Sequence, residues 1–86
     1  MHSILLVVDK PTSTNLKEQT KWNGFGDWIK NKASKDIKDS MLAEYVFLLP
    51  GKNGLGSLSH LVTQAEENKL RYRVLFFEKE PSWITS

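Results

Sequence analysis

The chain has 86 residues, of which 40% are hydrophobic and 26% are charged, and its formal net charge is +2. This length accommodates one α/β domain, residues 1–86, with a single modest core. The absence of cysteine excludes disulfides and thiolate metal sites, and no apolar run approaches the roughly 20 residues that span a bilayer. These features predict a cytoplasmic protein that does not bind membranes, and no motif requires a cofactor.

The first predicted element is a strand over residues 3–9, where aliphatic side chains follow one another almost without interruption. Such a run is typical of a central strand that is covered on both faces. Pro11 ends this strand, and residues 12–15 offer several N-caps for a helix that begins near Leu16.

An apolar stripe at helical spacing follows in residues 16–42, and its members are Trp22, Phe25, Ile29, Ala33 and Ile37. Gly24 and Gly26 lie inside this stripe, and each glycine costs about 1 kcal/mol in a helix interior. We therefore expect a turn near residues 23–26, with the main helix starting at about Gly26. Ser34 can cap a separate short helix, whereas residues 36–41 can alternatively form an irregular edge strand.

The most strongly patterned stretch, residues 43–80, predicts a strand, a glycine-rich turn, a helix and a second strand. The apolar run at residues 44–49 ends at Pro50, and Ser57 stands where a helix N-cap is expected. One apolar stripe of the following helix comprises Leu58, Leu61, Val62 and Ala65. Residues 71–77 form the last strand, which we expect to begin exposed and to end buried.

The predicted order is β-α(α)-β-α-β, with two or three helices on a sheet of three or four strands. A helix between two strands usually joins parallel neighbours, so we expect a mainly parallel or mixed sheet. A ferredoxin-like two-layer sandwich, in which part of residues 33–42 supplies a fourth strand, is the alternative.

The glycine-rich turn is a candidate anion or phosphate site, because free N–H groups at a helix start attract anions. Its residues are Gly51, Lys52, Gly54, Gly56 and Ser57. The lysine that precedes the Ser/Thr of a P-loop is missing, and the glycine spacing differs from the dinucleotide-binding pattern. A connecting turn without a ligand explains the same residues.

Asp9, at the end of the first strand, is the only candidate metal ligand. If the first two strong strands are adjacent and parallel, Asp9 and the glycine-rich turn lie at one edge of the sheet. A single carboxylate is a poor Mg²⁺ site, since that ion requires further oxygen ligands. No spacing of Ser, His and Asp indicates a catalytic set, so the chain is more consistent with a non-enzymatic protein.

Two groups of residues are candidate interaction surfaces. Trp28 lies off the apolar stripe and Trp83 lies near the end of the chain, so both can belong to an exposed aromatic patch. Arg71 and Arg73 alternate with Tyr72, a pattern that also suits RNA.

The sequence therefore predicts a small interaction or regulatory module that associates with a protein partner or with itself, including as a homodimer. The alternative is a nucleic-acid or nucleotide-phosphate binder, with or without a metal, that uses the strand ends and the turn at residues 51–57.

Overall fold

The structure is a computed structural model that describes residues 1–11 and 15–84. Its elements in chain order are β1 (Ser3–Val8), α1 (Leu16–Asn31), α2 (Lys35–Ser40), β2 (Met41–Ala43), β3 (Val46–Pro50), α3 (Gly54–Glu67) and β4 (Tyr72–Phe77). The predicted α/β class with three helices is confirmed.

The four strands form one sheet in the order β2-β3-β1-β4, and each neighbouring pair is antiparallel. The prediction of a parallel or mixed sheet is therefore wrong. Strands β3 and β4 do point the same way across α3, but β1 lies between them, so the helix joins strands that do not pair. Apart from α2, the element order is the β-α-β-β-α-β order of the ferredoxin-like alternative.

Helix α1 runs without interruption through Gly24 and Gly26, so the predicted turn at residues 23–26 is wrong. A Cβ on Gly24 would lie 2.6 Å from the side-chain oxygen of Asn68, and one on Gly26 would meet the hydroxyl of Tyr45. The two glycines therefore do not break α1. They allow Asn68 and Tyr45 to pack closely against it. Of the predicted caps, residues 12–14 lie outside the described residues, and Asn15 accepts a hydrogen bond from the Lys17 amide at 2.8 Å.

In the region after α1, the predicted short helix is confirmed, and the alternative edge strand over residues 36–41 is wrong for residues 36–40. The Ser34 hydroxyl caps α2 by accepting a hydrogen bond from the Ile37 amide at 3.3 Å. The short edge strand β2 follows α2 directly, beginning at Met41, and supplies the fourth strand of the sheet. A tight turn at Glu44 and Tyr45 then reverses the chain into β3, and Tyr45 adopts a positive φ of 57° there.

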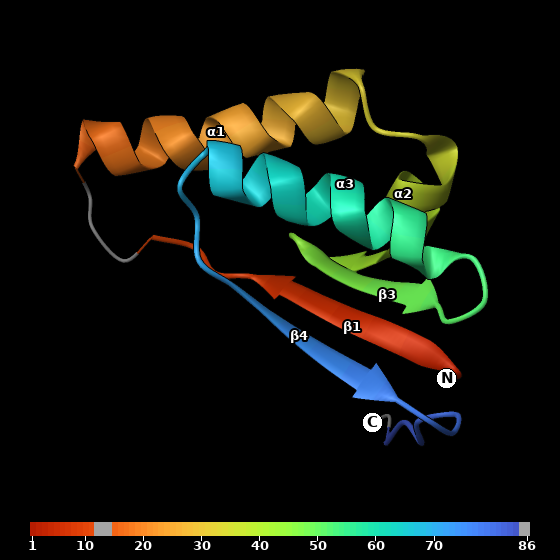
Figure 1. Cartoon of the computed structure of the whole chain (residues 1–86). Helices are drawn as coiled ribbons and strands as arrows, with labels where there is room; N and C mark the ends of the chain where they lie inside the picture. Colours follow the sequence, from red (N-terminus) through yellow and green to blue (C-terminus); the bar gives the residue numbers. More distant parts are fainter. Residues whose placement is uncertain (12–14, 85–86) are drawn as a thin grey trace.

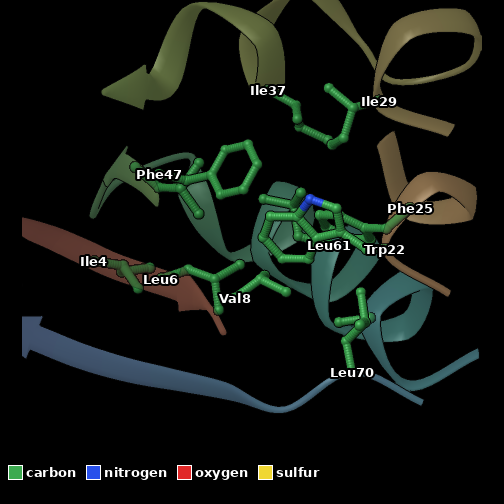
Figure 2. Close-up of a cluster of buried hydrophobic side chains, with 12 residues drawn as sticks. Ile4, Leu6, Val8, Trp22, Phe25, Ile29, Ile37, Phe47, Leu61 and Leu70 are labelled. Carbon is green, nitrogen blue, oxygen red and sulfur yellow. The ribbon is translucent and has the colours of Figure 1, made fainter. Parts of the chain in front are cut away.

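All three helices lie on the same side of the sheet, so the molecule has two layers (Figure 1). The core lies between them, where Ile4, Leu6 and Val8 of β1 face Phe25 of α1 and Leu61 of α3 (Figure 2). Among the described residues, the helices cover only one face of β1, and its alternate residues Leu5 and Val7 are half-buried. Cover of the second face by another copy of the chain, the other source we expect, stays a prediction.

The helical stripe of α3 is confirmed, with Leu61 and Ala65 buried and Leu58 and Val62 packed against the core. The helix begins at Gly54, so Ser57 lies in its first turn and is not the N-cap. Strand β4 does not end buried as predicted, because Leu75 and Phe76 are both exposed. It lies at the edge of the sheet, where one of its sides has no neighbouring strand among the described residues.

Candidate functional site

The face of the sheet opposite the helices is largely apolar. Directly opposite residues of antiparallel strands share a face, so the register assigns six apolar residues to this side. They are Leu5, Val7, Val46, Leu48, Leu75 and Phe77, and we call them the open face. Five of the six are half-buried, and Leu75 is 55% exposed.

Strand β4 also presents an apolar residue on its other face, where Phe76 is 52% exposed. Consecutive strand residues point to opposite faces, so Leu75 and Phe76 leave both faces of this edge strand uncovered at the same position along it. Neither a proline nor a bulge protects Tyr72–Phe77. Edge strands in natural proteins are usually protected by such devices.

Among residues 1–11 and 15–84, no strand pairs with the backbone groups on the outer side of β4. The Asp9 amide donates a hydrogen bond to the Arg71 carbonyl at 2.8 Å. Because the backbone groups of alternate residues point to the same side of a strand, the N–H and C=O groups of the odd-numbered residues in β4 point toward β1. The N–H and C=O groups of Tyr72, Val74 and Phe76 therefore point away from the sheet.

A depression of about 700 Å³ lies where β1 ends and β4 begins. Its lining includes four basic and two acidic side chains, and the residues are Asp9, Lys10, Pro11, Glu18, Lys69, Leu70, Arg71 and Arg73. Arg73 donates to the Asp9 carboxylate at 2.9 Å across the two strands. The structure thus brings together three predicted site residues, Asp9, Arg71 and Arg73.

This depression has the charge of an anion site rather than of a cation site. Arg73 already occupies one oxygen of Asp9, and the side chains around that carboxylate are mainly cationic. Across the described residues, no group of three or more His, Asp or Glu side chains is arranged to hold a metal.

Residues 51–57 lie at the opposite end of the sheet from Asp9. The antiparallel register sets Ser3 against Pro50, whereas Asp9 follows the other end of β1. The predicted meeting of Asp9 with the glycine-rich turn therefore does not occur, because that expectation depended on parallel strands.

The local contacts of the turn account for two of its glycines. A side chain on Gly51 would meet the backbone of Met1, and a Cβ on Gly54 would lie 3.0 Å from that of Leu49. The depression beside Ser57, of about 360 Å³, is also lined by the carboxylates Asp36 and Asp39, which repel anions. Lys52 and Gly56 are exposed.

The two predicted interface tryptophans occupy different environments. Trp28 is half-buried on α1 and stacks with the buried Phe25, with ring centroids 6.3 Å apart. Trp83 is 63% exposed and belongs to the tail beyond β4, away from the helix layer (Figure 1).

The exposed pair Leu75 and Phe76 was missed as a candidate surface from the sequence. The run Val74 to Phe77 resembles a buried strand end, and only its position at the sheet edge leaves these side chains uncovered. Lys69 and Glu18 were also missed, because they approach Asp9 only after α1 and α3 have packed.

Searches of protein-family models, of curated proteins and of solved structures find no match for this chain. Within residues 1–11 and 15–84, no helix has the length and apolar character needed to cross a membrane.

Proposed function

We propose that the protein is a non-enzymatic association module that binds another polypeptide through the outer edge of β4. The observation that carries this proposal is the exposure of Leu75 and Phe76 on opposite faces of one edge strand. Large apolar groups on an edge with free backbone groups are typical of sites that pair with another chain.

The total surface of the chain supports the same proposal. The chain exposes 6253 Å², whereas a compact monomer of this mass exposes about 5,200 Å². Its radius of gyration is 13.3 Å, compared with about 12 Å for a compact domain of this length. Leu75, Phe76 and Trp83, each more than half exposed, are part of this surface.

Photo-crosslinking tests the proposal at a single position. A benzophenone amino acid replaces Leu75 in one variant and Ser59, which is exposed on α3, in a matched control. We expect a crosslinked polypeptide, either a second copy or another protein, from position 75 and not from position 59. Equal labelling from both positions, or none from position 75, would contradict the proposal.

A second candidate function is binding of single-stranded nucleic acid in the depression at the ends of β1 and β4. The lining of this depression is mainly cationic. Its basic residues are Lys10, Lys69, Arg71 and Arg73. Phosphate groups are the expected ligands for such a lining.

This second candidate predicts RNA binding that weakens steeply as salt rises. Anisotropy of a labelled oligonucleotide measures this binding, with Lys69→Ala and Arg71→Ala as test variants and Lys30→Ala, on the exposed surface of α1, as the control. The test variants should weaken binding and reduce its salt dependence, while the control should change neither. Binding that all three substitutions leave unchanged would remove the depression as the site.

A further inference from the structure

We infer that the polypeptide bound at β4 is a second copy of this chain, added antiparallel to β4 so that the two sheets join into one. This inference rests on the proposed association function and names its partner. Three features of β4 carry it: its exposed side chains, its outward backbone groups and its charge pattern.

The exposed side chains favour an added strand over a layer stacked on the open face. A partner stacked on that face would cover Leu75 but leave Phe76 in water, since Phe76 points to the other side. A strand beside β4 places its own side chains next to both residues at once.

The outward backbone groups fit a symmetric antiparallel pair. A two-fold axis normal to the sheet makes each copy present the same surface to the other. The free N–H and C=O groups of Tyr72, Val74 and Phe76 in one copy then meet the same set in the partner. If the two-fold axis passes beside residue 74, 75 or 76, most of these outward N–H and C=O groups form hydrogen bonds with the partner copy.

The two ends of β4 carry charges of opposite sign. Arg71 and Arg73 stand at its start, and Glu78, Lys79 and Glu80, with a net charge of −1, follow its end. Antiparallel pairing sets the cationic end of one copy beside the anionic end of the other, whereas parallel pairing would set like charges together. Glu78 lies 3.7 Å from the Met1 ammonium in an exposed pair, which contributes little. Arg73 is engaged with Asp9, but this pair is exposed and contributes little, so the guanidinium can also meet a partner carboxylate.

The length of β4 also favours it over the other edge of the sheet as the site of an added strand, because its six residues offer a full pairing edge. The second exposed edge, β2, has only three residues and offers a much shorter template.

Cysteine variants test this geometry directly, because the natural chain contains no cysteine. Val74→Cys, Leu75→Cys and Phe76→Cys each place one thiol near the proposed axis, and Ser59→Cys on α3 is the control. In the purified protein, we expect at least one of the three to form a disulfide-linked dimer rapidly, and the best one identifies the axis. The control should remain largely monomeric under the same mild oxidation.

Phe76→Pro provides an independent variant, because it removes an outward N–H and an exposed side chain without touching the bonds to β1. Light scattering should give twice the mass of 9.9 kDa for the unmodified chain and the monomer mass for this variant. Circular dichroism should show that the variant retains the fold.

Two results overturn the inference. One is a monomer at every concentration without crosslinking from positions 74–76, and the other is a dimer that Phe76→Pro leaves intact. If, in addition, the benzophenone at position 75 captures only a different protein, the association function stands and the second copy is excluded. If it captures nothing, both proposals fail.

Discussion

Gly26 and Gly56 both lie within helices, but only Gly26 has a neighbour where a side chain would be. The phenol ring of Tyr45 approaches α1 at this point. It is held by Trp22 and Phe25, whose ring centroids are 4.2 Å and 5.0 Å from its own. Nothing lies within 4 Å of a Cβ built on Gly56. The same substitution should therefore have opposite effects at the two positions.

Gly26→Ala should lower the free energy of unfolding by about 1–3 kcal/mol, because the new methyl group displaces a tightly packed ring. Gly56→Ala should raise it by about 0.5–1 kcal/mol, since alanine favours the helical backbone. Urea unfolding of both variants measures the difference. A stabilising Gly26→Ala would show that Tyr45 moves away without cost.

Tyr45 also links stability to alkaline pH. Burial raises the pKa of its hydroxyl above the ordinary value near 10, and the carboxylates of Glu44 and Asp27 raise it further. The fold therefore favours the neutral phenol. Its contribution is complete below the unfolded pKa and is lost as the pH rises through the folded value.

Between about pH 9 and pH 11, the wild-type chain should lose more stability than Tyr45→Phe, which has no hydroxyl to ionise. Urea midpoints of both proteins across this range provide the measurement. The pKa of Tyr72 is also raised, by its hydrogen bond to Glu66, so Tyr72→Phe serves as the comparison for an exposed hydroxyl. Parallel curves for wild type and Tyr45→Phe would exclude the proposed linkage.

At the level of elements, we expect α2 to depend on its N-cap residue more than the longer helices do. It has only six residues, and Ser34 satisfies the amide of Ile37, whose side chain is part of the core. Ser34→Ala should cost about 1 kcal/mol of unfolding free energy. Ser59→Ala, at an exposed position of α3, should cost much less. Equal urea midpoints for the two variants would mean that packing of Ile37 alone holds α2.

The sequence predicted well those elements whose hydrophobic spacing or N-cap is determined by residues close together in the chain. The aliphatic run of β1, the stripe of α3 and the caps Asn15 and Ser34 each follow from a few neighbouring residues. The unbroken α1 could not be predicted, because its glycines are explained by Asn68 and Tyr45, which are distant in the sequence.

Strand direction was also beyond the sequence pattern. A buried apolar run looks the same in a parallel and in an antiparallel sheet. The direction of β3 is set by the hairpin with β2, whose three residues are exposed and show no alternation. Its turn contains Tyr45 in a left-handed conformation rather than the glycine or asparagine that usually marks such a turn. Of the candidate site, Asp9, Arg71 and Arg73 were named from the sequence, but their proximity depends on this topology.

At the scale of the whole molecule, the structure is a thin slab of 40 × 29 × 19 Å with one layer of helices. Such a molecule gains stability when the outer edge of β4 finds a partner, because binding that requires the fold shifts the unfolding equilibrium. The melting temperature of the unmodified chain should therefore rise with protein concentration. Phe76→Pro should melt at one temperature over the same range, and scanning calorimetry compares the two. A concentration-independent melting temperature for the unmodified chain would contradict dimerisation.

The position of β1 has a consequence for how the chain acquires its structure. This strand comes first in the sequence but lies in the middle of the sheet, between residues 46–50 and 72–77. The pairing of β1 with either neighbouring strand closes a long loop of the chain. The folding rate should therefore be low for a chain of this size. A ribosome must complete β4 before the centre of the sheet has both neighbours, and a chain that ends after Leu70 should not unfold cooperatively.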